Sequence, residues 1–234
     1  MSLIQTSAVG YFAATLATTV TLSGVASGNT LILLVTHANF DATNGSTIIV
    51  ASDSQGTYGI DQENGGSRFS CDIMRLSTAN AGTHTVTATA QYGTSANSYG
   101  QAILTEWSGL NTFDTGTGVD QESTQNTGPV SSGATGTLGS STDLAIAVSC
   151  LGDQSGTYPV GGWGTPSGWT NIYQDTTNNH FPTSVAYKQL ASNAAVTANF
   201  GTLATAGEWV ANVSTYLPAS AASSGLLLFE NQGF

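Results

Sequence analysis

Apolar side chains recur at every second position in this sequence, and that period limits the fold more than any other feature. His84 to Ala90 reads H-T-V-T-A-T-A, so threonine alternates with small apolar residues. An alternation of this kind turns one set of side chains towards a core and the other towards solvent, as in a half-buried β-strand. Clusters such as TNGS, ENGG and SSGATG separate the apolar runs, and no amphipathic helix of three turns interrupts them. The pattern predicts an all-β protein.

The apolar segments occur twice in the same order. SGNTLILLVTHANF (27–40) is echoed by SSTDLAIAVSCLGD (140–153), which aligns Leu31 with Leu144 at a spacing of 113 residues. QAILTEWSGL (101–110) is echoed by VANVSTYLPA (210–219), which places Trp107 opposite Tyr216. A repeated strand order indicates an architecture that is itself duplicated.

We therefore predict one antiparallel, jelly-roll-like β-sandwich over residues 1–218. Its half-repeats cover about 1–113 and 114–218, and each half is expected to contribute strands to both sheets. Two small sandwiches in tandem are the alternative. Residues 219–234 are predicted to form a separate spacer and docking arm.

Charge is scarce and mostly negative, which limits the partners. Only 7% of residues are charged, the net charge is −11, and the cations are Arg68, Arg75 and Lys188. Binding to phosphate backbones needs clustered lysine and arginine, so nucleic acid is not expected as a partner. No stretch approaches about 20 apolar residues, so membrane insertion is not expected either. The first 20 residues lack a basic leader, and no secretory signal is predicted.

Motifs for catalysis are missing from the sequence. It has no G-x-S-x-G, no H-E-x-x-H and no phosphate-binding loop, and the three histidines lie far apart. Glu106 and Glu208 each precede a tryptophan, but the duplication puts them at different strand positions, which disfavours a glycosidase pair. We predict no catalytic residue, no bound cofactor and no enzymatic activity. Cys71 and Cys150 fit no metal-binding spacing and are either buried free thiols or one disulfide.

An acidic stretch is a weak candidate for calcium binding. The stretch DQENGG supplies Asp61, Glu63 and Asn64 before two glycines, and Asp53 lies just upstream. Calcium favours carboxylate and carbonyl oxygens gathered on a loop. The spacing does not match the EF-hand pattern, so a solvated acidic loop is the simpler interpretation.

Aromatic residues gather among glycines in YPVGGWGTPSGWTNIY (158–173). An exposed indole can stack on a sugar ring, so this loop is a candidate glycan contact. Trp163 lies between glycines and is predicted to be exposed, with Tyr158 beside it. Trp169 is predicted to close one end of the sandwich instead.

The chain ends on its most apolar short segment, SSGLLLFENQGF. The apolar side chains that we predict to contact a partner are Leu226, Leu227, Leu228, Phe229 and Phe234. Burial of these five contributes about 8–15 kcal/mol, which nearly cancels the cost of ordering about twelve residues. Backbone hydrogen bonds to the edge strand of a sheet would add the free energy needed to order the arm. The arm either closes its own sandwich or crosses the ASAASSG spacer to a neighbouring subunit.

The chain resembles the β-sandwich domains of tailed-bacteriophage virion proteins, which include head decoration proteins, head fibres and tail-fibre modules. The segments that carry the resemblance are SGNTLILLVTHA, GTHTVTATA, ILTEWSGLNTFD, TDLAIAV, PSGWTNIY and VAYKQLAS. The resemblance implies a structural or adhesive role and transfers no catalytic residue.

Under this resemblance, the partners are copies of the chain itself, capsid or tail proteins, or a host-surface glycan. The implied location is the virion, with a bacterial cell surface as the alternative. A carbohydrate-binding adhesin that uses residues 158–173 is the alternative function.

Overall fold

The computed structural model describes residues 1–39, 49–65, 68–91, 93–121, 127–152, 162–175 and 181–219. The regular secondary structure of these residues consists of antiparallel strands and one short 3₁₀ helix, η1 (Ser95–Asn97). The predicted all-β, antiparallel sandwich is confirmed. In the described ranges, no helix has the length and apolar character needed to cross a membrane.

The first half of the chain forms two sheets. Its strands are β1 (Ser2–Thr6), β2 (Gly10–Ala13), β3 (Ala17–Val25), β4 (Thr30–Asn39), β5 (Ile49–Asp53), β6 (Gly56–Thr57), β7 (Gly59–Gly65), β8 (Phe69–Leu76), β9 (Gly82–Ala90) and β10 (Ser98–Ser108). The N-inner sheet has the order β1-β10-β4-β8-β7, with β2 also paired to β10. The N-outer sheet has the order β3-β9-β5-β6.

The second half repeats this plan with fewer strands. They are β11 (Leu110–Asp120), β12 (Val130–Ala134), β13 (Leu144–Gly152), β14 (Thr170–Asp175), β15 (Thr183–Gln189), β16 (Thr197–Gly201) and β17 (Glu208–Pro218). The C-inner sheet has the order β11-β17-β13-β15-β14, and the C-outer sheet pairs β12 with β16.

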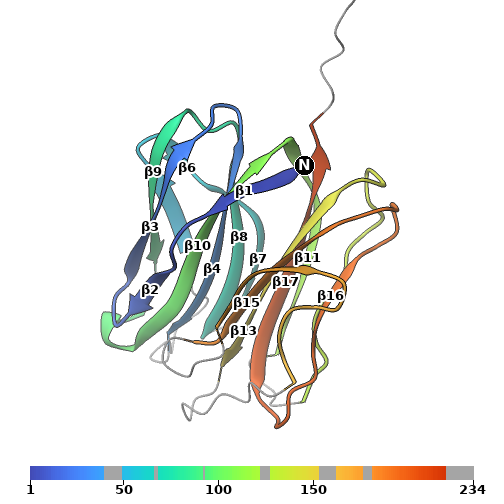
Figure 1. Cartoon of the computed structure of the whole chain (residues 1–234). Coiled ribbons are helices and arrows are strands. Elements are labelled where there is room, and N and C mark those ends of the chain that lie inside the picture. The colour runs from blue at the N-terminus through green and yellow to red at the C-terminus, as the bar shows by residue number, and fades with distance from the viewer. Residues whose placement is uncertain are drawn as a thin grey trace, which may run out of the picture.

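The four sheets stack as layers with three apolar clusters between them (Figure 1). The N core joins the N-outer and N-inner sheets, the central core joins the two inner sheets, and the C core joins the C-inner and C-outer sheets. The inner sheets are therefore covered on both faces. In β4, Leu31, Leu33 and Val35 enter the N core while Ile32 and Leu34 enter the central core. Burial on both faces explains the unbroken apolar run of this strand.

The duplication is confirmed strand by strand. The order β1-β10-β4-β8-β7 corresponds to β11-β17-β13-β15-β14, and β3-β9 corresponds to β12-β16. The prediction that each half contributes strands to both sheets is wrong, because every sheet among the described strands comes from one half. The sheets divide the chain at Gly109, so position 113 falls within β11.

The predicted alignment of β4 with β13 is wrong by one residue. Leu31 faces the N core, whereas Leu144 faces the central core. A spacing of 113 therefore aligns residues that lie on opposite faces of their inner sheets. A spacing of 114 pairs Ile32 with Ile146, both in the central core. Because strand side chains alternate, a slip of one residue exchanges the two faces. Trp107 and Tyr216 do correspond, since both are fully buried in the central core.

Two polar contacts across the central core follow the same duplication. The Thr36 and Thr183 hydroxyl oxygens lie 2.7 Å apart, and the Cys71 and Cys150 sulfurs lie 3.1 Å apart. Thr36 of the first half corresponds to Cys150 of the second half. Each has a partner directly opposite on the neighbouring strand, Cys71 for Thr36 and Thr183 for Cys150. Both cysteines are free and buried, and burial, followed by the contact with Cys150, raises the pKa of the Cys71 thiol. The inner sheets thus meet through duplicated contacts.

Candidate functional site

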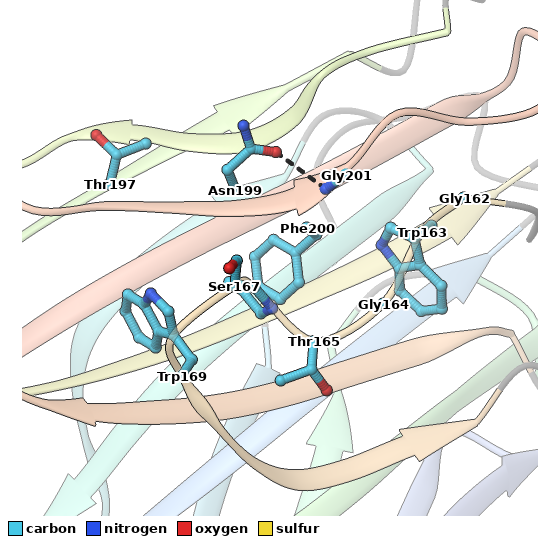
Figure 2. Close-up of a pocket in the computed structure, with 11 residues that line it drawn as sticks. Gly162, Trp163, Gly164, Thr165, Ser167, Trp169, Thr197, Asn199, Phe200 and Gly201 are labelled. Carbon is cyan, nitrogen blue, oxygen red and sulfur yellow. Dashed lines mark hydrogen bonds between the residues drawn. The ribbon is translucent and has the colours of Figure 1, made fainter.

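A groove of about 560 Å³ opens between β16 and the segment 162–169 on the second half of the molecule (Figure 2). The side chains that define it are Trp163, Thr165, Ser167, Trp169, Asn199 and Phe200. Its volume lies within the roughly 300–1,000 Å³ typical of small-molecule sites. The described lining contains aromatic rings, hydroxyls and an amide but no charged side chain.

Among the described residues, the second half has no strand that corresponds to β5, and the groove lies in the place of that strand. In the N-outer sheet, β5 pairs with β9 from Ile49 to Ser52. The strand that corresponds to β9 is β16, and segment 162–169 makes only one bridge to it, between Trp163 and Gly201. Gly164 N–H adds one hydrogen bond to the Phe200 carbonyl, at 2.8 Å. After Gly164 the chain turns away from β16, and the space between this segment and β16 forms the groove.

Two glycines allow this loop to approach β16 at the closed end. Gly162 has φ of +82° and Gly201 has φ of +106°, both in the region that favours glycine. A Cβ atom on Gly201 would lie 2.2 Å from the Gly162 carbonyl oxygen. A Cβ atom on Gly162 would lie equally close, at 2.2 Å, to the Thr202 carbonyl oxygen. Gly162 and Gly201 are therefore required for this main-chain contact.

Of the two tryptophans, Trp163 differs from its prediction. Trp163 is only 5% exposed, belongs to the C core and donates from Nε1 to the Ser149 hydroxyl at 3.1 Å. The prediction that Trp163 is exposed is therefore wrong. Trp169 is half-buried, packs against the edge of the C core and lies at the open end of the groove (Figure 2). Tyr158, the other predicted glycan contact, lies outside the described residues.

Local chain geometry explains the position of Trp169. Its backbone N–H donates to the Pro166 carbonyl at 3.1 Å, which closes a turn just before β14. Gly168 supplies the positive φ, +75°, that this turn uses. On the other wall, Asn199 Oδ1 accepts the Gly201 N–H at 2.9 Å, which fixes the plane of the Asn199 amide (Figure 2).

Two of the predicted calcium ligands, Asp53 and Asp61, are held by other protein groups. Asp61, Glu63 and Asn64 belong to strand β7 and not to a loop, and Asp61 forms a two-point ion pair with Arg75 at 2.8 and 3.1 Å. Asp53 lies in the N-outer sheet and contacts His84 Nδ1 at 2.6 Å. Within the described ranges, no three or more histidine, cysteine or acidic side chains group as a metal site would require.

The two glutamates that precede tryptophans lie in different sheets. Glu106 is fully buried in β10 and accepts hydrogen bonds from Ala26 N, Asn29 Nδ2 and Gln5 Nε2 at 2.9, 2.6 and 2.5 Å. Burial opposes its ionisation, but these three bonds outweigh burial and hold the Glu106 pKa below its usual value. Glu208 lies in β17 and pairs with Arg68 at 3.5 Å. The structure does not bring the two carboxylates together.

Both described histidines are fully buried. Burial lowers the pKa of His37 to about 4, and its Nε2 lies 2.7 Å from the Ser98 hydroxyl. Its counterpart in the second half is Leu151, not Cys150, because of the corrected spacing. Both ring nitrogens of His84 have partners: Nδ1 contacts Asp53, and Nε2 contacts the Asn80 carbonyl oxygen. Neither ring is placed for proton transfer with a substrate.

The predicted partner contacts of the arm, Leu226 to Phe229 and Phe234, lie outside the described residues. The described chain ends just after β17, where Ala219 N–H donates to the Gly109 carbonyl at 2.8 Å. This bond ties the start of the arm to the junction between the two halves.

Comparison with models of known protein families gave no match, and neither did comparison with curated proteins.

Proposed function

We propose that this protein is a non-enzymatic structural component of a tailed-phage virion, a capsid decoration or fibre protein. It attaches to neighbouring subunits through residues 219–234. The proposal begins from the resemblance of its strand segments to virion β-sandwich proteins. Its partners are further copies of the chain and the capsid or tail proteins that it contacts.

The observation that carries the proposal is that the described part of the body exposes few large apolar side chains against which the arm could pack. The large hydrophobic side chains that the described body exposes are Ile4, Tyr11, Val50 and Ile60, which lie on four different strands. Four scattered side chains do not form a patch that could cover five apolar residues. Another molecule is therefore the better host for the arm.

Surface composition supports the same role. With 7% charged residues, the body must be hydrated by hydroxyl and amide groups. Both arginines are paired, Arg68 with Glu208 and Arg75 with Asp61. A surface with few charged side chains offers a partner few ion pairs, so attachment depends on a dedicated segment.

Truncation after Ala219 tests the proposal. The full chain and the truncated chain are each added to particles that lack the protein, and binding is measured by co-sedimentation. We expect the truncated body to unfold at the same temperature as the full chain but to lose particle binding. A control that replaces Leu226 and Leu228 by serine keeps the length of the arm and should also lose binding.

Two outcomes contradict the proposal. Co-sedimentation of the truncated chain would show that the arm is not the attachment. A fall of several degrees in its unfolding temperature would show that the arm belongs to its own body.

A further inference from the structure

We infer that the groove between β16 and segment 162–169 binds a short neutral oligosaccharide, with Trp169 as the ring on which one sugar stacks. This function is separate from attachment through the arm. The inference rests on the shape of the groove, the state of its two tryptophans and the chemistry of its walls.

Trp169 has the properties of a stacking platform. One part of the ring packs against the C core, which holds it in place, and the rest is accessible at the groove. A sugar ring has an apolar face of C–H groups, and a flat indole covers that face with little loss of side-chain entropy. Trp163 cannot serve this purpose, because its ring is buried and its N–H is bonded to Ser149.

The opposite wall supplies groups suited to sugar hydroxyls. Asn199 and Thr197 are exposed on β16, and Ser167 is exposed on the facing loop. Hydroxyl and amide groups both donate and accept hydrogen bonds, as sugar hydroxyls do. The Gly201 N–H holds the Asn199 amide in one orientation, so this group is preorganised.

The charge pattern selects a neutral sugar. The described lining has no charged side chain, and the chain as a whole carries −11. A cation does lie beside the loop: Lys188 Nζ would be 4.0 Å from a Cβ atom on Gly168, outside the described lining. The net charge of −11 nevertheless disfavours a carboxylated or phosphorylated glycan.

Addition of a peptide strand fits the groove less well. The slot corresponds to the place that β5 occupies beside β9, but the Trp163 bridge and the Gly164–Phe200 hydrogen bond already close one end of it. The open part of β16 covers only Thr197 to Asn199. A typical strand has about five or six residues, so three positions give an added strand little pairing.

The test uses the full chain with an array of neutral glycans and calorimetric titration of three soluble probes, maltotriose, cellotriose and chitotriose. We expect saturable binding of at least one neutral glycan. Trp169→Ala should weaken it at least tenfold, and Asn199→Ala about threefold. Trp169→Phe keeps a flat ring and should retain most of the affinity.

Two controls separate binding from folding. Val50→Ala shortens an apolar side chain that is 42% exposed on β5 of the N-outer sheet, at the other end of the stack of sheets from β16, and should leave binding unchanged. Thermal unfolding of each variant checks that the body remains intact, and the Trp169→Phe result stands if Trp169→Ala does not fold.

Three results would overturn the inference. The first is a lack of binding to any neutral glycan on the array. The second is a Trp169→Ala variant that folds as wild type and binds the glycan with wild-type affinity. The third is binding of the peptide SSGLLLFENQGF at the groove, lost in Trp169→Ala, while all sugars fail, which would identify strand addition instead.

Discussion

Buried carboxyl groups give this protein a pH dependence that its low charge would not suggest. Asp143 is fully buried at the start of β13, beside the carboxyl group of Asp114. Burial, followed by the hydrogen bond and negative charge of Asp114, raises the Asp143 pKa from 3.8 to about 6. A carboxyl group whose pKa is raised on folding binds more protons in the folded state, so its contribution to stability is lost as the pH rises.

We therefore predict that Asp143→Asn reduces the loss of stability between about pH 4 and pH 6. Below this window Asp143 is protonated in both states, so it favours neither one. Above it, the folded state carries the cost of a buried charge beside Asp114, and the uncharged asparagine avoids that cost. Unfolding temperatures of both proteins at half-unit pH steps measure the effect. Parallel pH profiles for the two proteins would contradict it.

At the scale of strands, close main-chain contacts depend on single glycines. Gly100 in β10 has φ of +148°, and a Cβ atom there would lie 2.0 Å from the Thr36 carbonyl oxygen of β4. We predict that Gly100→Ala lowers the free energy of unfolding by about 2–4 kcal/mol, because the side chain forces the two strands apart. Gly136 is the matched control: its nearest neighbour would lie at 3.8 Å, so Gly136→Ala should change stability by less than about 0.5 kcal/mol. Chemical denaturation measures both, and equal midpoints would contradict the prediction.

The element scale also shows where sequence patterns lose information. In LILLV every position is apolar, so the pattern identifies a strand but not which side chains face which core. That ambiguity produced the spacing of 113 in place of 114. The pair Trp107 and Tyr216 was aligned correctly, because two large aromatic residues at the ends of their strands mark a single register.

At the scale of the molecule, the two halves stabilise one another through the central core. Ile32, Ile73 and Trp107 of the first half pack there against Ile146 and Val210 of the second. We predict that residues 1–109 alone expose this face and associate or aggregate. Size-exclusion chromatography and binding of a hydrophobic dye would measure this. Co-expression with residues 110–234 should restore a single folded species, and a stable, dye-free monomer of 1–109 would contradict the prediction.

The sequence by itself determined the all-β class, the antiparallel strands and the repeated strand order, because these follow from alternation and turn residues that act over a few positions. Only the tertiary structure decided that the halves form separate sheet pairs, that Trp163 is buried and that Trp169 lines a groove. Those features depend on which segments meet after tens of residues of intervening chain. In the part of the chain that the structure describes, β16 has no neighbour that corresponds to β5, and a local sequence pattern does not record a strand that fails to pair.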